Sequence, residues 1–240
     1  MDKDSLLVLF IGDSLISSHY KDVRLEKTYL YLLEMFWREL DPKTYTQAVS
    51  KPGSLLIQIF GSVTDWFTLN TGLRKVDICI VHCGIIDCSP RVLTHGMRTV
   101  VSSLPTSLRN LVIKLLHRSR RSLLKSGWSY RYTPPKKFKR IYTDLVKFLS
   151  SRVSRLYLID IAPGKDFLYL HSPGLKSSIL EYNKLIGSLK TEFPEVHLIQ
   201  TFEHFQEYPE KYLTEDLHIT EEGQFYIYSQ IRELEIPYLR

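Results

Sequence analysis

The chain has 240 residues, of which 44% are hydrophobic and 12% aromatic, and it carries a formal net charge of +6. This composition supports a sizeable buried core and excludes a disordered chain, and the length fits one α/β domain. No run of about twenty apolar residues is present, so we expect no membrane span. Residues 1–4 do not resemble a cationic leader, which predicts a cytoplasmic protein, peripheral to the inner membrane at most.

Three cysteines, Cys79, Cys83 and Cys88, lie within ten residues of one another. They are odd in number and lack the spacing of a zinc site, which indicates buried thiols in a reducing compartment. The histidines likewise show no spacing typical of metal ligands. We therefore expect no metal site and no cofactor.

Strands and helices are predicted to alternate along the chain. Short apolar runs predict strands over residues 5–11, 44–49, 76–81, 155–161 and 196–200. Helical spacing of apolar residues predicts helices over 23–40, 54–67, 92–125, 141–149 and 173–189, and a last helix from Thr220. The aromatic and basic stretch 127–139 contains two prolines and is predicted to be a loop. This alternation favours a parallel sheet covered by helices on both faces.

Three predicted loops carry groups suited to catalysis. Gly12-Asp13-Ser14 follows the first strand, residues 84–91 (GIIDCSPR) follow the third, and residues 215–220 (EDLHIT) precede the last helix. The Gly-Asp-Ser triplet alone also describes an ordinary turn at the end of a strand. Loops at the carboxyl ends of parallel strands share one edge of the sheet, however, so these residues can meet there.

The residues in these loops predict a serine nucleophile. Such a serine needs a base within hydrogen-bond reach, and the base needs a carboxylate that fixes its tautomer. Ser14, His218 and either Glu215 or Asp216 supply these groups. The backbone amides of Ser14 and Gly53 are candidates for the oxyanion hole, which stabilises negative charge on the substrate.

Three further charged residues lie next to these groups. We expect Asp87 to brace its loop through backbone N–H groups rather than to take part in the chemistry. Arg91 is expected either to bind an anionic group of a substrate, which its planar guanidinium suits, or to be an ordinary surface arginine. Asp13 directly precedes the predicted nucleophile and, like Asp87 and Arg91, is expected to take part in substrate binding or in bracing the loop.

The order of these motifs resembles the SGNH/GDSL hydrolase family. The matching parts are the strand into Gly12-Asp13-Ser14 and the tracts at 82–91, 178–186 and 217–224. The tract GIIDCSPR resembles a bacterial subgroup associated with surface-polysaccharide genes. The resemblance implies a flavodoxin-like α/β/α sandwich of three layers with about five parallel strands. It also implies that Ser14 is the nucleophile, His218 the base and Gly53 an oxyanion donor.

Two residues depart from the family pattern. Ile86 replaces an asparagine of the third motif and cannot donate a hydrogen bond to the oxyanion, an interaction typically worth about 3–4 kcal/mol. Glu215 stands where the family has aspartate, three residues before the histidine, and Asp216 is the alternative carboxylate. Together these departures predict weak hydrolytic activity.

We therefore expect a serine esterase that removes an O-acyl group, with O-acetyl as the expected case, from a carbohydrate or a related small ester. One alternative is an O-acyltransferase that uses the same serine and histidine, with a sugar hydroxyl in place of water. A second alternative, favoured by Ile86, is a non-catalytic protein that binds a glycan or a partner in the same cleft.

The charge of the chain is concentrated in one segment. Residues 88–143 contain thirteen Lys and Arg residues and no Asp or Glu. We expect residues 1–240 to form a single domain in which residues 92–150 are a basic insertion. Residues 109–140 are predicted to contact an anionic glycan or a membrane surface, or else to form a solvated face that covers the core. No nucleic-acid-binding module is recognised, so nucleic acid is not an expected partner.

Overall fold

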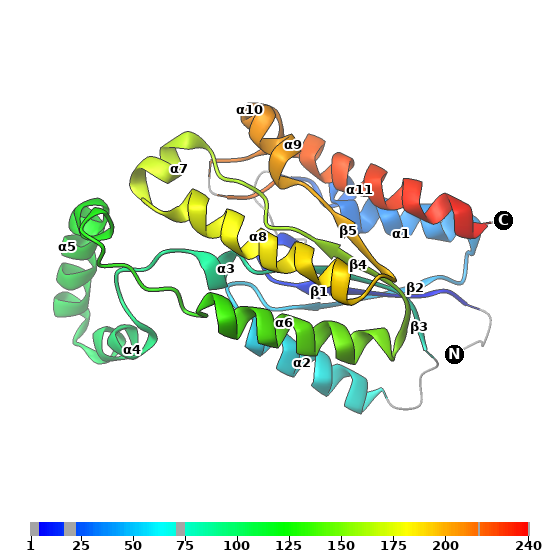
Figure 1. Ribbon diagram of the computed structural model, residues 1–240, viewed down its shortest axis with the longest axis horizontal. Helices are drawn as coiled ribbons and strands as arrows, with labels where there is room; N and C mark the ends of the chain where they lie inside the picture. The colour runs from blue at the N-terminus through cyan, green and yellow to red at the C-terminus, as the bar shows by residue number, and fades with distance from the viewer. Residues whose placement is uncertain (1–4, 17–22, 71–74, 216, 240) are drawn as a thin grey trace.

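A five-stranded parallel sheet forms the centre of the computed structural model, which describes residues 5–16, 23–70, 75–215 and 217–239 (Figure 1). The strand order is β2-β1-β3-β4-β5. The strands are β1 (Leu7–Gly12), β2 (Tyr45–Ser50), β3 (Val76–His82), β4 (Val153–Ile159) and β5 (Val196–Ile199). All five predicted strands are present, with bounds shifted by two residues at most.

The central strand β1 is buried along its whole length. It pairs with β2 on one side and β3 on the other, and its apolar side chains face helices on both faces of the sheet. Strands of this kind have continuous apolar sequences, which is why residues 7–11 contain no polar side chain. The edge strand β2 is largely exposed or half-buried, and its apolar pattern is correspondingly weaker.

Helices cover both faces of the sheet (Figure 1). On one face, α1 (Tyr29–Leu40) packs against α11 (Glu221–Glu235). On the other face, α6 (Pro135–Ser150) lies between α2 (Leu56–Leu69) and α8 (Leu175–Glu192) and contacts both. The predicted three-layer α/β/α sandwich is thereby confirmed.

Three of the predicted helices are wrong by more than three residues or in number. The helix expected over 23–40 begins only at Tyr29, after a separate 3-10 helix (Leu25–Lys27), because the Thr28 side chain caps its first turn by accepting from the amide of Tyr31. The single helix expected over 92–125 is divided into α4 (His95–Ser103) and α5 (Thr106–Lys125), because Pro105 cannot donate the hydrogen bond that would continue α4. The helix expected from residue 141 begins instead at Pro135, where a proline in the first turn costs no backbone hydrogen bond. The loop expected over 127–139 is therefore shorter.

Four short helices lie in segments for which no helix was predicted. They are α3 (Ile85–Cys88), α7 (Asp166–His171), α9 (Phe202–Glu207) and α10 (Pro209–Tyr212). Segments of four to six residues are too short to show helical periodicity in a sequence. Among the described residues, no helix is both long and apolar enough to cross a membrane.

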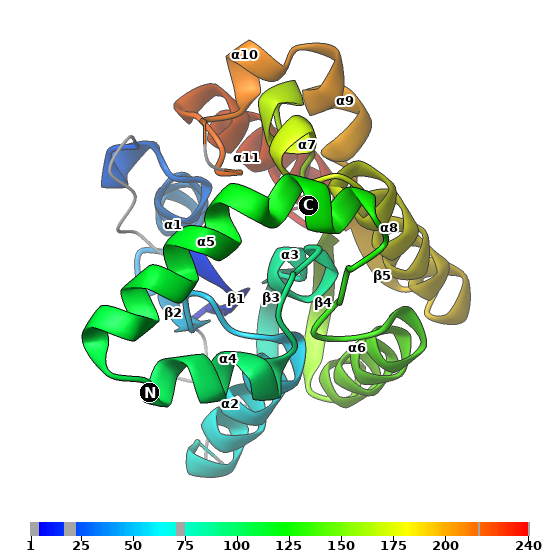
Figure 2. The same cartoon turned by 90° about the vertical axis from the view of Figure 1, so that its left-hand side faces the viewer.

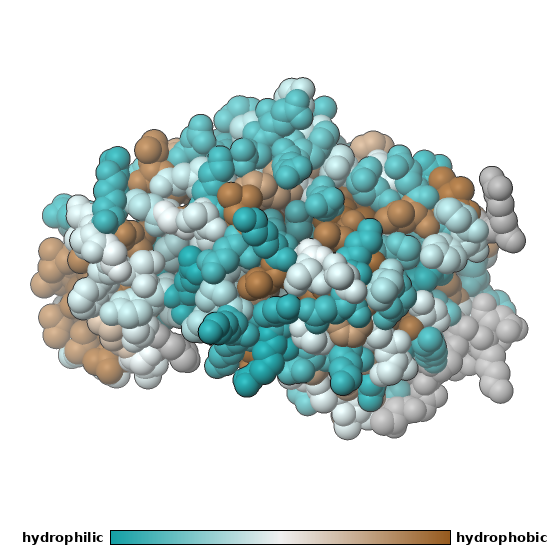
Figure 3. Space-filling view, viewed as in Figure 1, coloured by the Kyte–Doolittle hydropathy of each residue, from teal (hydrophilic) through white to brown (hydrophobic). Residues whose placement is uncertain are grey.

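Helices α4 and α5 project beyond the carboxyl ends of the strands (Figures 1 and 2). Their attachment to the sandwich is mainly polar. The indole Nε1 of Trp128 donates to the carbonyl oxygen of Val92 at 2.9 Å, and Arg91 and Tyr130 form an antiparallel bridge. Apolar side chains remain exposed on the pair, including Val100 and Leu111, and Figure 3 shows apolar residues gathered at this end of the molecule.

The three cysteines are buried and unpaired with one another, as the sequence predicts. Cys79 lies in β3, Cys83 follows that strand, and Cys88 ends α3. Burial raises the pKa of all three thiols above its ordinary value.

Gly12 lies where β1 and β3 approach each other too closely to leave room for a side chain. A Cβ atom there would lie 2.1 Å from the carbonyl oxygen of His82 in the neighbouring strand. We therefore expect Gly12→Ala to lower the free energy of unfolding by about 3 kcal/mol, because the two strands must separate locally. Chemical denaturation measures this change.

The matched control is Gly61→Ala in α2, where the added Cβ meets no atom within 4 Å. This variant should stabilise the helix by up to about 1 kcal/mol. Equal stability of the two variants would contradict the close approach of β1 and β3.

Candidate active site

Ser14 lies directly beyond the end of β1. The chain leaves the sheet at Gly12, passes the fully buried Asp13, and enters a short 3-10 helix, Ser14–Ile16. The turn is held by the neighbouring strand, since the hydroxyl of Ser50 at the end of β2 donates to the carbonyl oxygen of Asp13 at 3.1 Å. The half-buried Ser14 is thus held by the most buried strand of the protein.

His218 is presented by a tight loop before α11. Leu213 and Ile219 form an antiparallel bridge, and the amide of His218 donates to the hydroxyl of Thr214 at 3.2 Å. Leu217, the residue before the histidine, has a φ of 75°. A non-glycine residue in this left-handed region carries strain of about 1–2 kcal/mol, which the surrounding contacts must offset.

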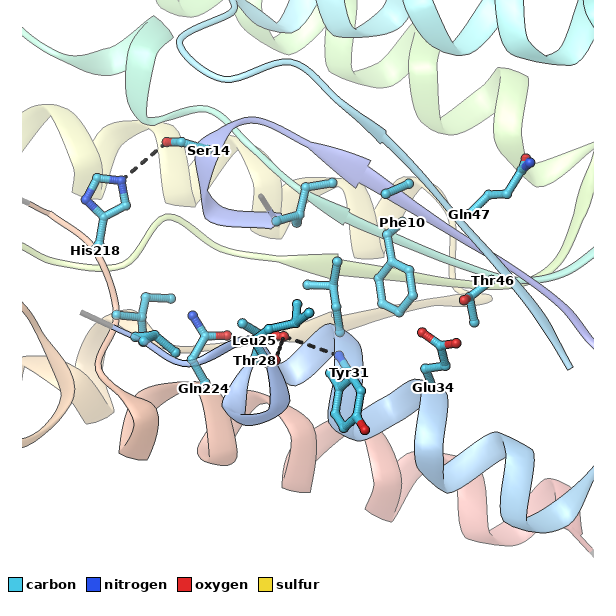
Figure 4. A pocket seen from close by; sticks show the side chains of 15 residues that line it. Phe10, Ser14, Leu25, Thr28, Tyr31, Glu34, Thr46, Gln47, His218 and Gln224 are labelled. Carbon is cyan, nitrogen blue, oxygen red and sulfur yellow. Dashed lines mark hydrogen bonds between the residues drawn. The ribbon is translucent and has the colours of Figure 1, made fainter. Parts of the chain in front are cut away.

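The structure brings Ser14 and His218 together although they are 204 residues apart in sequence. The Ser14 hydroxyl oxygen lies 3.4 Å from Nε2 of the imidazole (Figure 4). This separation is slightly longer than an ideal hydrogen bond, as is common for a nucleophile and its base before substrate binds. A small approach of the two side chains would bring them to the distance that proton transfer from a serine to a histidine requires.

Only one of the two candidate carboxylates, Glu215, lies in the described part of the chain. Among the described residues, the partner of Glu215 is Lys165, whose Nζ lies 3.0 Å from its carboxylate, rather than His218. The Glu215 side chain is 75% exposed, while that of Lys165 is only 10% exposed and also pairs with Glu210 at 2.6 Å. Asp216 lies outside the described residues. The identity of the orienting acid therefore stays a prediction.

Gly53 lies in the turn that follows β2. Its φ is 72°, a conformation that favours glycine, and no atom lies within 4 Å of an added Cβ. The amide of Lys51, two residues earlier, donates to the carbonyl oxygen of Gly12 at 3.2 Å. This bond joins the turn to the segment that carries Ser14, so Gly53 stays a candidate oxyanion donor.

Asp87 joins three segments at the carboxyl end of β3. One carboxylate oxygen accepts from the amide of Leu56 at the start of α2 at 2.9 Å, and the other accepts from the hydroxyl of Thr133. Its neighbour Ile86 is half-buried and packs against the core, and its side chain has no group that could donate to an oxyanion. These contacts tie the start of α2 and the segment before α6 to the end of β3, and the bracing role of Asp87 stays a prediction.

Burial raises the pKa of the Asp87 carboxyl to about 6. The folded protein therefore holds this proton more tightly than the unfolded chain, and stability is lost as the pH rises from about 4 to 6. We expect this one group to lower the free energy of unfolding by about 3 kcal/mol across that window. Asp87→Asn should flatten the profile, which denaturation at pH 4, 5 and 7 would show.

Asp160 is also buried, and burial raises its pKa to about 6 as well, so part of the slope will remain in the Asp87→Asn variant. The readout is the shape of the pH profile and not the stability at any one pH. Profiles of the same shape for wild type and variant would contradict the raised pKa of Asp87.

A cavity of about 400 Å³ opens beside Ser14 and His218 (Figure 4). Its walls come mainly from β1, β2, α1 and the segment before α1, and they combine apolar and polar side chains. Thr28, Tyr31 and Glu34 supply polar groups. No motif in the sequence marks these residues, because on α1 they follow the ordinary spacing of an amphipathic helix.

His82 is a second buried histidine at this end of the sheet. Its Nδ1 lies 3.2 Å from the hydroxyl of Tyr29, and burial lowers the pKa of the imidazole to about 3. A histidine at the end of β3 that stays neutral throughout the physiological range and packs against Tyr29 of α1 has a structural role.

Comparison with solved structures identifies proteins of similar fold. A lipase/acylhydrolase from Enterococcus faecalis has a TM-score of 0.64 at 13% sequence identity, and the similarity covers 98% of this chain and 97% of that chain. An acetylxylan esterase from Geobacillus stearothermophilus has a TM-score of 0.60 at 13% identity over 95% of this chain and 93% of that chain. A member of the lipolytic G-D-S-L family from Veillonella parvula has a TM-score of 0.59 at 9% identity, with 96% and 98% covered.

No protein-family model matches the sequence, and no curated protein matches it. The structural similarity extends over nearly the whole chain, so it is the fold and not a shared fragment that agrees. The chain therefore has the fold of the SGNH/GDSL ester hydrolases, as its motifs predict. Assignment to the subgroup associated with surface polysaccharides stays a prediction.

Proposed function

We propose that the protein is a serine esterase of the SGNH type. The observation that carries the proposal is the 3.4 Å separation of the Ser14 hydroxyl and Nε2 of His218, beside a cavity large enough for a small ester. A serine and a histidine at this distance form the core of a nucleophilic site. The solved structures with this fold include lipases and acetylxylan esterases.

The geometry supports a two-step acyl transfer. The Ser14 oxygen attacks the ester carbonyl while His218 accepts the hydroxyl proton, and the negative charge that develops on the carbonyl oxygen is directed to the Ser14 and Gly53 amides. When the tetrahedral intermediate collapses, His218 gives the proton to the departing alcohol oxygen. Water then attacks the acyl-serine, again with His218 as base, and releases the acid and free Ser14.

We propose an O-acetyl group on a carbohydrate as the substrate. Two observations support it: the acetylxylan esterases share the fold, and the cavity beside Ser14 is lined by a mixture of apolar and polar side chains, such as Phe10 and Gln47, as a sugar ester requires. If a sugar hydroxyl replaced water in the second step, the same two residues would catalyse acyl transfer, and the product would be an acetylated sugar instead of acetate.

The first test is the reactivity of Ser14 itself. We expect a fluorophosphonate probe to label the intact wild-type protein, because proton transfer to His218 activates the Ser14 hydroxyl. Labelling should be lost in Ser14→Ala and retained in Ser62→Ala, which removes an exposed serine from α2. In-gel fluorescence measures both. A folded wild type that does not react would refute the esterase and favour the non-catalytic binding protein.

A further inference from the structure

A second cavity, of about 360 Å³, lies between α4, α5 and the segment after α3. Its polar lining is almost entirely cationic or aromatic, and comprises Arg91, Arg98, Arg109, Arg120, His117 and Tyr132. Ser102 and aliphatic side chains form the remaining walls. The cavity is distinct from the one beside Ser14, and none of the residues in its lining is shared with that one.

Among the residues that the structure describes, no carboxylate neutralises the positive charge of this cavity. Residues 88–143 contain no Asp or Glu, and within the described parts of the chain no carboxylate forms an ion pair with any of the four arginines. Guanidinium groups gathered without carboxylates repel one another, and an anion between them would relieve this repulsion.

Two of the arginines are held in place by the surrounding structure. The guanidinium of Arg120 donates to the carbonyl oxygen of Pro90 at 2.9 Å and to the Ser172 hydroxyl at 2.8 Å. Arg91 lies over the ring of Tyr132, with 5.4 Å between its guanidinium carbon and the ring centroid. Its Nε is buried and makes no hydrogen bond to the described residues. This site is therefore built in advance, with a donor that still lacks an acceptor.

The electrostatics agree with this geometry. Burial lowers the pKa of Arg91, and the neighbouring Arg98 lowers it further. Burial and the charge of Arg91 together lower the pKa of Arg120. Both side chains stay charged at neutral pH, so the cavity holds at least two partly desolvated cations close to each other.

The cavity lies at the same edge of the sheet as Ser14. Arg91 follows α3 at the carboxyl end of β3, and β3 pairs directly with β1, which leads to Ser14. Figures 1 and 2 both show α4 and α5 placed beyond this edge. A group bound between the two helices can therefore belong to the same extended molecule as an ester bound at Ser14.

We propose that the cavity between α4 and α5 binds an anionic group, a carboxylate or a phosphate, of the ester substrate. This inference rests on the proposed esterase function and narrows its substrate to an O-acylated acidic carbohydrate. Arg91 and Arg98 act as binding residues, and Arg120 positions Arg91 by fixing the wall of the cavity.

Kinetics with matched esters test the proposal. We expect kcat/KM for an O-acetylated oligosaccharide of hexuronic acids to exceed that for the matched O-acetylated neutral oligosaccharide by about tenfold or more, the usual effect of a charge-assisted hydrogen bond. Arg98→Gln should remove most of this preference. An O-acetylated sugar phosphate, measured in parallel, distinguishes a phosphate site from a carboxylate site.

Arg118→Gln is the matched control, because Arg118 is exposed on α5 and does not line the cavity. It removes the same charge and should leave the preference unchanged. If Arg98→Gln and Arg118→Gln alter all esters equally, the effect is one of net charge and the proposal is overturned.

Calorimetric titration separates this proposal from the esterase itself. Glucuronate or inorganic phosphate should bind to wild type and to Ser14→Ala, and Arg98→Gln should weaken binding about tenfold. If the wild type binds glucuronate or phosphate but hydrolyses no ester, the result supports the anion site and refutes only the proposed reaction. Absence of binding, or binding only to anionic phospholipid vesicles that glucuronate does not displace, would overturn the anion site.

Discussion

His218→Ala is expected to lower kcat for acetyl-ester hydrolysis by about 10³-fold or more, because Ser14 then has no base to accept its proton. Ser14→Ala should cost at least as much. The double variant should be no slower than the slower single variant, since two residues that act as one unit do not contribute additively. Single-turnover measurements with 4-nitrophenyl acetate give these rates even where the overall turnover is slow.

The control for this prediction is His171→Ala. His171 is exposed in α7, and its recorded hydrogen bond is to the carbonyl oxygen of Phe167 in the same helix. Its loss should leave kcat within a factor of about two, as expected for a surface substitution far from the reacting atoms. Rates that multiply in the Ser14→Ala, His218→Ala double variant would contradict a cooperating pair.

Ile86→Asn is expected to raise kcat by about 10²-fold, which is the contribution of one side-chain donor to an oxyanion hole. Ile86 is the second residue of α3, which follows the carboxyl end of β3, and its side chain is half-buried. An asparagine there introduces an N–H group at this edge of the sheet without filling additional space. The gain should appear in kcat rather than in KM, because the donor binds charge that develops only in the transition state.

Ile86→Val separates this effect from repacking. Valine removes one methylene and supplies no donor, so kcat should not rise. If the asparagine and valine variants have equal kcat, the third motif does not contribute to the oxyanion hole, and the weak activity predicted from Ile86 has no basis.

The sequence predicts the bounds of the strands better than the bounds of the helices. Residues 7–11 of β1 and residues 78–81 of β3 are apolar because they are buried on both faces of the sheet, and such runs can be recognised without any knowledge of their neighbours. The predicted start of α6 is too late because a Pro-Pro pair such as Pro134-Pro135 can either break a helix or stand at its beginning. Only the packing of α6 against α2 and α8 distinguishes the two.

Part of the candidate site can likewise be predicted from the sequence. The strand-to-turn transition at Gly12 and the position of His218 before the last helix both follow from local patterns. The partner of Glu215 does not, because Lys165 lies 50 residues away and no spacing rule relates two loops at such a separation. The arginines around the second cavity were visible as a charge excess, whereas their convergence depends on the break at Pro105 that folds α4 against α5.

The three buried thiols offer a way to follow the opening of the core. Because each side chain is shielded by the sheet or by α3 and each thiol stays protonated, alkylating reagents cannot modify the native chain at an appreciable rate. Modification of Cys79 in particular must wait until β3 separates from its neighbours. The rate of alkylation in native buffer therefore reports the free energy of the local opening that exposes Cys79. For the same reason, a loss of activity on brief treatment with a serine reagent can be assigned to serine without interference from cysteine.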